Sequence, residues 1–517
     1  MLRLGEFMSN NDRPAFLASG EPARLIPVLS DGSREGRTTS IFLAALMAVP
    51  PFGRLVMGSL GLRLGKLARI QCFTEVTLVD EAAGAKSRPD GLIMVSTGRQ
   101  EWRALVEAKC GNAALQETQV ETYLDLAKRN NIDAVITISN ELAALPTHHP
   151  LTRIKRHGKG PALYHWSWVY LLTEATLLIS QSPKEFDDPE QRYILSEVVR
   201  FFRHQSSGVS RFDRMNSEWK DVVAAVQSGS PLSRSSSEVI QTVATWHQGQ
   251  RNICLQLSRK LGRNVGLRLT KAHADNFEQR LRDDSEQLSN DGQLKFEVDV
   301  PGAAAPIEIV ADLRRRNVTC SMRLAAPLDK KSTTARLNWL VRQLQKTTAD
   351  NVYIRTTWPG RAAPTQVTLH RARENPEALQ NPNVTTAATS FEVLMIDDFA
   401  ADFGRNVKFV ERMETVVANF YEQIAEHLRA WVPTPPKITQ DVLSQPERPI
   451  ILQADEAMPQ AHEDRITREA SEVPMPDSQA APSHNADNNE DRESAANLSV
   501  AAALAADPPP GGLNLID

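Results

Sequence analysis

Residues 88–110 of the chain read RPDGLIMVSTGRQEWRALVEAKC. The segment contains two runs that are rich in strand-forming residues, 89–95 and 102–108, and these predict two β-strands that follow each other in the chain. Each run carries an acidic residue close to one end. Asp90 lies at the start of the first run, and Glu107 lies at the end of the second.

A carboxylate and an ammonium group lie close together at the end of the second strand. Glu107 and Lys109 are two residues apart, and residues two apart on a strand point to the same side. The residues before them, 104–106, are apolar, so the two charges are costly there unless the protein uses them. If the two strands pair, the carboxylates of Asp90 and Glu107 converge and can hold Mg²⁺ through oxygen ligands. Lys109 can then hold or help deprotonate a metal-bound water and offset charge at a phosphorus centre.

Helices are predicted before and after these strands. The segment 37–49 has a helical pattern, and Pro50-Pro51 must stop this helix. The elements in order are a helix at 37–49, strands at 71–80, 89–95 and 102–108, a helix at 115–129 and a strand at 134–138. Because strands and helices alternate in this way, the sequence predicts an α/β unit.

The second half of the chain predicts an α+β domain. A Ser-rich break at 228–237 is typical of a linker or hinge. Beyond it, strand-like runs surround a helix and are followed by a last amphipathic helix. Before the break, the predicted elements are a strand-like segment at 164–172 and helices at about 189–205 and 216–227. After it, they are helices at about 238–261, 333–347 and 407–431 and strands at 293–300, 306–312, 317–324, 351–356, 365–370 and 391–396.

These patterns divide the chain into five predicted parts. The parts are a flexible N-terminal arm at 1–22, an α/β domain at 23–180, a helical extension and linker at 181–235, an α+β domain at 236–432 and a disordered acidic tail at 433–517. The tail is predicted from its composition, which is rich in Pro, Ala, Asp and Glu and poor in aromatic residues. Such a segment has too little apolar surface to form a core.

Composition narrows the class of protein. With 41% hydrophobic and 24% charged residues, most of the 517-residue chain can bury a core. The longest apolar run, 41–49, is far shorter than the roughly 20 residues that span a bilayer. Residues 1–8 contain no apolar stretch of a signal peptide, and the four cysteines lack a paired spacing for zinc or disulfides. We therefore expect a cytoplasmic protein without a membrane partner.

The net charge of −4 hides an uneven distribution. Residues 441–517 contain 4 basic and 15 acidic residues, a net charge of −11, whereas residues 1–440 contain 55 basic and 48 acidic residues, a net charge of +7. The positive excess of the body is modest. Nucleic acid would therefore bind locally at a cleft rather than over the whole surface.

Taken together, the motifs resemble those of the PD-(D/E)XK nuclease superfamily. The match consists of Pro89-Asp90, then 17 positions to Glu107, one spacer residue, Ala108, and Lys109. The restriction-endonuclease-like core of this family, a helix, three strands, a helix and a strand, fits the predicted order and implies a mixed sheet flanked by helices. The resemblance implies that Asp90 and Glu107 bind Mg²⁺, or Mn²⁺ in its place. It also implies that the carbonyl of Ala108 can join them and that Lys109 is catalytic.

Two further features extend this resemblance, which covers roughly residues 30–180. Members often carry another glutamate on the first helix, and Glu35 is placed for that role, with Glu75 on the first strand as the competing metal ligand. A subset of the family has Gln-x-x-x-Tyr on the helix after the third strand, which here is Gln119 to Tyr123. Gln119 is on the inward face, where its amide needs a partner that the active site can supply. We assign Gln119 to the catalytic group and Tyr123 to substrate binding.

A basic segment follows the fourth predicted strand, near the expected cleft. Its members suit contacts with phosphate groups, although a solvated loop has the same pattern. These residues are Arg153, Lys155, Arg156 and Lys159. Four histidines nearby fit no usual zinc spacing, and they are His148, His149, His157 and His165.

The candidate residues also have simpler interpretations. Asp90 could be a turn residue before a glycine, and Glu107 with Lys109 could be an ion pair at the surface end of a strand. Glu35 could be an acid that the dipole of its helix favours. Trp168 is interpreted as a core or interface aromatic residue.

We expect a metal-dependent nuclease that hydrolyses phosphodiester bonds, with DNA as its nucleic-acid partner. The alternative is a non-catalytic, nuclease-like binding or assembly module, in which residues 236–432 contact a protein partner or a second copy of the chain. Every position of the Asp90, Glu107 and Lys109 set is present, which favours the enzyme. A nuclease requires these three side chains to lie within a few ångströms of one another.

Overall fold

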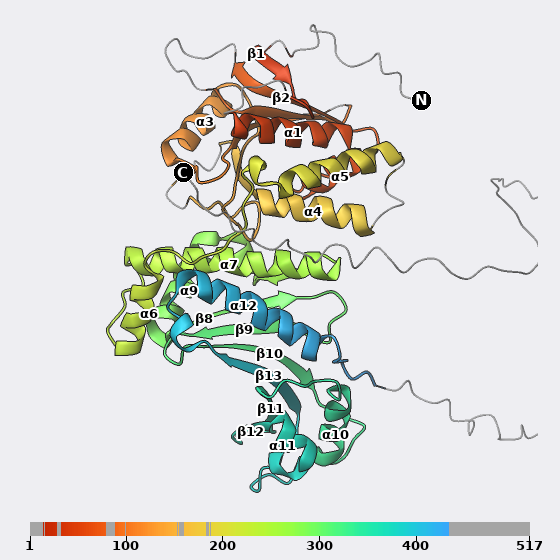
Figure 1. The fold of residues 1–517 in the computed structure, drawn as a ribbon, viewed down its shortest axis with the longest axis vertical. Coiled ribbons are helices and arrows are strands. Elements are labelled where there is room, and N and C mark those ends of the chain that lie inside the picture. The colour runs from red at the N-terminus through yellow and green to blue at the C-terminus, as the bar shows by residue number, and fades with distance from the viewer. Residues whose placement is uncertain are drawn as a thin grey trace, which may run out of the picture. The chain divides into compact units, whose positions relative to one another are not determined.

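A computed structural model of the protein describes residues 14, 16–27, 33–78, 88–98, 100–151, 154, 160–181, 186 and 188–433. Within these residues the chain forms a six-stranded mixed sheet and a seven-stranded antiparallel sheet, each with helices packed against it (Figure 1). The predicted α/β fold with a following α+β domain is therefore confirmed. The predicted tail lies outside the described residues from position 434 onward.

The first sheet holds its six strands in chain order. The pairs β1–β2, β2–β3 and β3–β4 are antiparallel, whereas β4–β5 and β5–β6 are parallel. A parallel pair needs a crossover connection, which α3 (Glu117–Arg129) supplies between β4 and β5. The strands are β1 (Leu17–Pro22), β2 (Arg69–Leu78), β3 (Gly91–Ser96), β4 (Glu101–Ala108), β5 (Ala134–Ser139) and β6 (Ala162–Ser167).

Helices cover both faces of this sheet because the side chains on both faces of its central strands are apolar. Val106 and Ile136 belong to the cluster formed with four helices, and Leu105 and Val135 belong to the cluster formed with α3. The four helices are α1 (Arg34–Ala48), α2 (Pro50–Gly58), α4 (Trp168–Gln181) and α5 (Pro189–Arg203). Strands buried on both faces are continuously apolar, as in the segment that precedes Glu107.

The proline pair after the first helix does not end helical structure. α1 ends at Ala48, but α2 begins at Pro50, because proline is tolerated in the first turn of a helix. No single helix among the described residues is long and apolar enough to cross a membrane. α1 and α2 reach the necessary length and composition only as a pair, and that pair is bent by 106°.

Two other segments differ from the prediction. Residues 17–22, placed in the flexible arm, form β1 and pair with β2. The segment 164–172, predicted as one strand, is divided between the end of β6 and the start of α4. The hydroxyl of Ser167 accepts a hydrogen bond from the N–H of Tyr170 at 3.2 Å, which caps the new helix. The start of α4 could not be recognised in the sequence, because aromatic and β-branched residues, which favour strands, lie on both sides of Ser167.

The second sheet has the strand order β12-β11-β13-β10-β9-β8-β7. All of its neighbouring strands are antiparallel. The six predicted strands are present, and the short β7 is an addition. The strands are β7 (Gly266–Arg268), β8 (Gln293–Asp299), β9 (Ile307–Asp312), β10 (Asn317–Ala325), β11 (Val352–Thr357), β12 (Thr365–Thr368) and β13 (Ser390–Asp398).

The helices of the second half lie before, between and after these strands. They are α6 (Trp219–Ser228), α7 (Ser237–Leu261), α8 (Lys271–Asp275), α9 (Phe277–Asp291), α10 (Thr333–Gln343), α11 (Leu369–Glu374) and α12 (Asn406–Phe420). Short 3₁₀ helices lie at Gln205–Ser207, Pro376–Leu379 and Ala400–Asp402. The predicted helix at 407–431 is shorter than expected, because α12 passes into a π-helical turn at Tyr421–Ala425. α8, α9 and α11 were not predicted, and α11 takes the last two residues of the strand predicted at 365–370.

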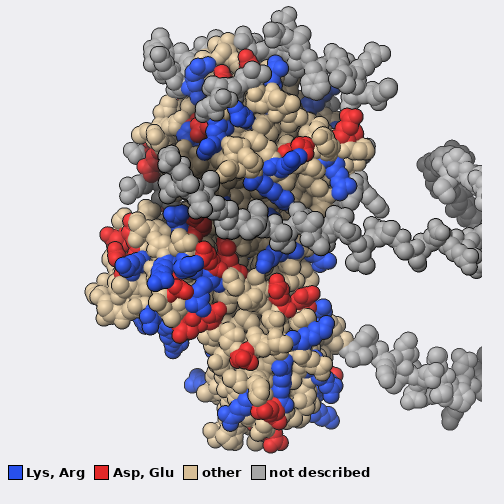
Figure 2. Space-filling view, viewed as in Figure 1, with Lys and Arg blue, Asp and Glu red and all other residues tan. Residues whose placement is uncertain are grey.

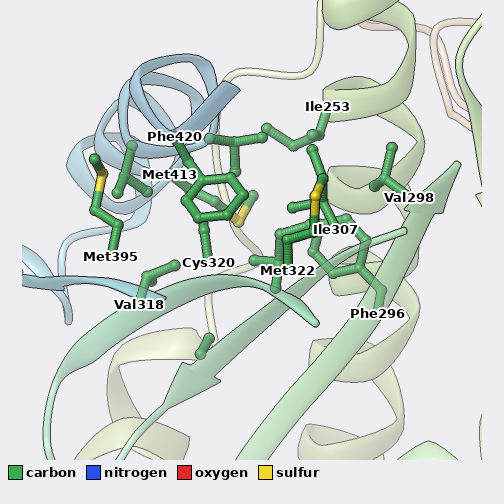
Figure 3. Close-up of a cluster of buried hydrophobic side chains, with 14 of the residues drawn as sticks. Ile253, Phe296, Val298, Ile307, Val318, Cys320, Met322, Met395, Met413 and Phe420 are labelled. Atoms are coloured by element: carbon green, nitrogen blue, oxygen red, sulfur yellow. The ribbon is translucent and has the colours of Figure 1, made fainter. Parts of the chain in front are cut away.

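One face of the second sheet carries the core of this half. Phe296, Cys320 and Met322 point from the strands toward α7 and α12, where Ile253 and Met413 meet them (Figure 3). The alternate positions of β8 are partly exposed. This pattern is typical of an antiparallel sheet with one apolar and one polar face.

Candidate active site

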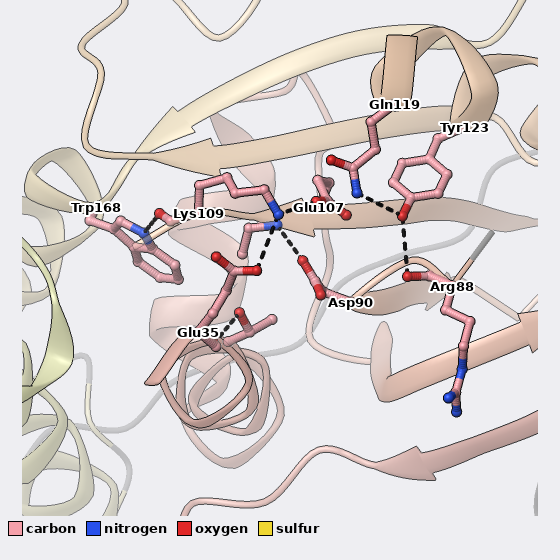
Figure 4. Close-up of polar contacts among 10 residues, drawn as sticks. Glu35, Arg88, Asp90, Glu107, Lys109, Gln119, Tyr123 and Trp168 are labelled. Atoms are coloured by element: carbon pink, nitrogen blue, oxygen red, sulfur yellow. Dashed lines mark hydrogen bonds and ion pairs between the residues drawn. The ribbon is translucent and has the colours of Figure 1, made fainter. Parts of the chain in front are cut away.

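Four charged side chains from separate elements meet at the end of β4 (Figure 4). Glu107 belongs to β4, and Asp90 immediately precedes β3. Glu35 lies in the first turn of α1. Lys109 follows the last residue of β4, and its ammonium group contacts two of the carboxylates. The structure therefore gathers Glu35, Asp90, Glu107 and Lys109 into one cluster.

The Lys109 side chain is held between two carboxylates, and its backbone is fixed on both sides. Nζ lies 2.5 Å from Oε1 of Glu107 and 3.1 Å from Oε1 of Glu35. The backbone N–H of Lys109 donates to the carbonyl of Ile138 at 2.8 Å. Its carbonyl accepts a hydrogen bond from Nε1 of Trp168 at 2.9 Å. Trp168 was interpreted as a core residue, and it is fully buried, but this contact also makes it a support of the site.

Asp90 is positioned by backbone groups of two neighbouring strands. Its Oδ2 accepts a hydrogen bond from the N–H of Ala108 at 2.8 Å, and its carbonyl accepts one from the N–H of Glu75 at 3.2 Å. The next residue, Gly91, has no room for a side chain, because a Cβ there would lie 2.6 Å from Cδ1 of Leu43 on α1. The Asp-Gly pair is therefore more than a turn signal, since glycine lets α1 approach the strand that follows Asp90.

Burial makes these carboxylates difficult to ionise together. Burial is the main cause that raises the pKa of Asp90 from 3.8 to about 8, and the charge of Glu107 adds to it. Burial also raises the pKa of Glu107, whose side chain is 1% exposed, against the opposing effect of Lys109. For Lys109, burial disfavours the charged form, but the hydrogen bond and charge of Glu107 outweigh it and the pKa is raised. The lysine therefore remains charged at neutral pH.

The cluster contains an oxygen atom that a cation would satisfy. Oε2 of Glu107 is buried and accepts no hydrogen bond from the described residues. Asp90 and Glu107 offer only oxygen atoms, and Mg²⁺ typically binds one or two carboxylates and completes its shell with water and substrate phosphate. Within the described residues, no group of three or more His, Cys, Asp or Glu side chains is already arranged to hold a metal ion. The donor set thus fits a partly hydrated cation rather than a closed structural site.

Gln119 and Tyr123 meet next to the cluster but contact the backbone near Asp90. Nε2 of Gln119 donates to the Tyr123 hydroxyl at 3.1 Å, and that hydroxyl donates to the carbonyl of Arg88 at 3.1 Å (Figure 4). Burial, followed by the charge of Glu107, raises the pKa of Tyr123, so its hydroxyl keeps its proton. The structure therefore places Gln119, predicted as catalytic, where it orients the Tyr123 hydroxyl. Both residues then hold the segment that carries Asp90.

Of the two competing glutamates, only Glu35 contacts Lys109 within the described residues. Glu75 is exposed on β2 and has a φ of 52°, in the left-handed region. Its contact with the site is the backbone hydrogen bond to the carbonyl of Asp90. This geometry favours Glu35 as the additional carboxylate, and it gives Glu75 a positioning role through its backbone.

The predicted phosphate-binding segment cannot be placed in this site. Arg153, Lys155, Arg156 and Lys159 lie outside the described residues. Their role in substrate binding stays a prediction.

Two of the noted histidines belong to a buried chain of hydrogen bonds beneath the sheet edge. Thr137 Oγ1 lies 2.8 Å from Nε2 of His149 and 2.8 Å from Nδ1 of His165. Nδ1 of His149 accepts from the N–H of Leu151, and Nε2 of His165 donates to the carbonyl of Glu141. Burial lowers the pKa of His165 to about 4, so this ring is neutral at physiological pH. No pattern in the sequence indicates Thr137, which links the two rings.

Comparison with known proteins supplies no relative. No family model, curated protein or solved structure matches the chain. The functional conclusion therefore depends on the geometry and chemistry of this cluster.

The stability of the metal-free protein is expected to fall as the pH rises. Because the pKa of Asp90 is raised from 3.8 to about 8, the folded state binds more protons than the unfolded state between these values. The free energy of unfolding in EDTA should therefore decrease from about pH 4 to about pH 8, and Asp90→Asn should flatten this dependence. Denaturant unfolding across this range measures both effects. An equally steep decrease in Asp90→Asn would contradict the assignment to Asp90.

Proposed function

We propose that this protein is a metal-dependent nuclease that hydrolyses phosphodiester bonds in DNA, with Mg²⁺ as its metal or Mn²⁺ in its place. The observation that carries the proposal is the cluster at the end of β4. There, a buried carboxylate oxygen of Glu107 has no hydrogen-bond partner among the described residues, and a charged lysine lies 2.5 Å from the other oxygen of the same side chain. A site of this kind offers carboxylate oxygens to a cation and a positive donor beside them.

The residues of the cluster have distinct roles in this proposal. Asp90 and Glu107 would hold the metal, which when bound supplies a Lewis acid and an activated water. Lys109 keeps its proton, because its pKa is raised, and donates N–H groups to the charge that develops on the phosphate oxygens. Glu35 holds the ammonium group from the side of α1. Trp168 fixes the backbone from which the lysine extends.

The resemblance to the PD-(D/E)XK nucleases supports the same function. The Pro-Asp, Glu-x-Lys and Gln-x-x-x-Tyr motifs, and the order of helices and strands, agree with that family's pattern. On the face shown in Figure 2, acidic and basic side chains are interspersed over the described surface. Nucleic acid would then be held locally at the cluster at the end of β4 rather than by a broad basic surface.

The proposal is tested by incubating the full-length protein with single-stranded and double-stranded DNA, and with the corresponding RNAs. We expect DNA cleavage with Mg²⁺ or Mn²⁺ and none with EDTA, because the carboxylates need the metal to bind a phosphate group. Product lengths on denaturing gels measure the reaction. Cleavage that continues in EDTA would refute the metal-dependent mechanism. Absence of cleavage from all four substrates with either metal would favour the binding or assembly module.

A further inference from the structure

A cavity of about 440 Å³ lies in the second half of the protein, apart from the candidate active site. Its walls come from α7, α8, α9 and the strands β7, β8 and β9. Leu267 and Phe296 provide apolar surface, and Arg280 and Gln250 provide polar groups. The nuclease proposal gives no role to this cavity.

Arg280 is a buried charge whose hydrogen bonds are incomplete. Its side chain is 3% exposed. Nη2 donates to Oε1 of Gln250, and Nε lies 3.8 Å from Oδ2 of Asp284. Nη1 has no hydrogen-bond partner among the described residues. A buried guanidinium with an unused N–H group is costly, so the fold retains this arginine at the expense of stability.

Gln250, on the facing helix α7, also has a buried N–H donor without a partner among the described residues. The residue is 0% exposed, and its carbonyl oxygen is occupied by Arg280. Its Nε2 finds no acceptor within the described part of the chain. Because the two side chains are hydrogen-bonded to each other and both line the cavity, one ligand group with two oxygens can reach both unused donors.

Most of the other charged groups of the cavity already have partners, whereas Lys295 has no ion pair among the described residues. Oδ2 of Asp284 lies 2.6 Å from Nε2 of His247, and Arg268 pairs with Glu297 at 3.5 Å. The hydroxyl of Ser321 donates to Glu308 at 3.5 Å. What the cavity lacks is therefore an acceptor, not another donor. The lining carries as many basic side chains as carboxylates, namely Arg268, Arg280 and Lys295 against Asp284, Glu297 and Glu308. A monoanion adds one negative charge at the buried guanidinium that has an unused N–H group, whereas a dianion would add two.

We propose that this cavity binds a small organic monocarboxylate, whose oxygens accept hydrogen bonds from Arg280 and Gln250. Its apolar part contacts Leu267 and Phe296. The second half of the protein is then a ligand-binding module that is chemically independent of the phosphodiester site.

The test measures the thermal unfolding midpoint of the full-length protein as sodium acetate, propionate or benzoate is added, with sodium chloride at matched ionic strength and inorganic phosphate as comparisons. A ligand that binds only the folded state raises the midpoint in a saturable manner. We expect such a rise with at least one of the monocarboxylates and none with chloride. A response to phosphate without any response to the monocarboxylates would overturn the proposal, and so would no saturable response at all.

Variants locate the response in the cavity. Arg280→Met keeps much of the length of the side chain but removes its donors, so the carboxylate response should be lost; its midpoint without ligand should fall, because Gln250 and Asp284 lose a partner. Gln250→Leu should lose most of the response, and it serves as the second test if Arg280→Met does not fold. Arg282→Met, an exposed position of the same helix, should respond like the wild type. An undiminished response in Arg280→Met or Gln250→Leu would place binding elsewhere and refute the assignment.

Discussion

Replacing Lys109 by methionine is expected to reduce DNA cleavage by at least about a hundredfold, the loss that follows removal of a single transition-state donor. The ammonium group of Lys109 supplies the positive charge of the cluster. Its Nζ lies 2.5 Å from Oε1 of Glu107 and 3.1 Å from Oε1 of Glu35. Methionine retains much of the length of the side chain but cannot donate a hydrogen bond. Single-turnover cleavage with saturating Mg²⁺ measures the chemical step, and fluorescence anisotropy measures DNA binding separately.

Two further variants separate catalysis from folding. Lys109→Arg keeps the positive charge, so the thermal midpoint in EDTA should stay near that of the wild type, but its planar group cannot replace the compact ammonium and cleavage should remain low. Lys128→Met removes an exposed lysine on α3 and should cleave like the wild type. If Lys109→Met cut DNA at the wild-type rate, its assignment as the catalytic lysine would be wrong.

Glu107→Gln is expected to abolish cleavage without lowering the stability of the metal-free protein. The carboxylate is 1% exposed, and one of its oxygens has no partner among the described residues, so ionising it in the folded state is unfavourable. Glutamine keeps an oxygen that can accept from Lys109 and removes the buried negative charge. In EDTA the midpoint should equal or exceed that of the wild type, whereas the rise in midpoint on adding Mg²⁺ should be lost.

The same measurements distinguish the two candidate glutamates. Glu35→Gln weakens the hold on Lys109, and we expect cleavage to fall about tenfold or more, an effect of about 1.4 kcal/mol on the barrier. Glu75→Gln should have little effect, because its side chain is exposed and its contact with the site is made by the backbone. A larger loss in Glu75→Gln than in Glu35→Gln would reverse the assignment made from the structure. A destabilised Glu107→Gln in EDTA would show that the carboxylate is well accommodated without metal.

Much of the first fold was predictable because its signals are local. The apolar run that ends at Glu107 indicated a strand buried on both faces, and the polar and apolar faces of the 117–129 segment indicated a helix. The helix that begins at Trp168 was missed because its start depends on one hydroxyl, that of Ser167, within a run of strand-forming residues. In the same way α9 was missed, because few of its residues are apolar and buried.

The charged residues of the candidate site could be named from the sequence, but the residues that hold them in position could not. The spacing of Asp90, Glu107 and Lys109 carries chemical information that a sequence displays directly. By contrast, Trp168 reaches the carbonyl of Lys109 from an element 59 residues away, and an indole N–H looks the same in sequence whether it packs or donates. The choice of Glu35 over Glu75 also depended on tertiary structure, because each lies at a suitable place in its own element.

The order of strands in the second sheet limits how a partner can attach to it. The two edges of that sheet are its shortest strands, β7 with 3 residues and β12 with 4. Long edge strands expose unpaired backbone groups that recruit strands from other chains, and short edges remove most of this opportunity. A protein partner of this half would therefore recognise side chains rather than extend the sheet by another strand. Short edge strands also protect the sheet against edge-to-edge aggregation when the protein is concentrated.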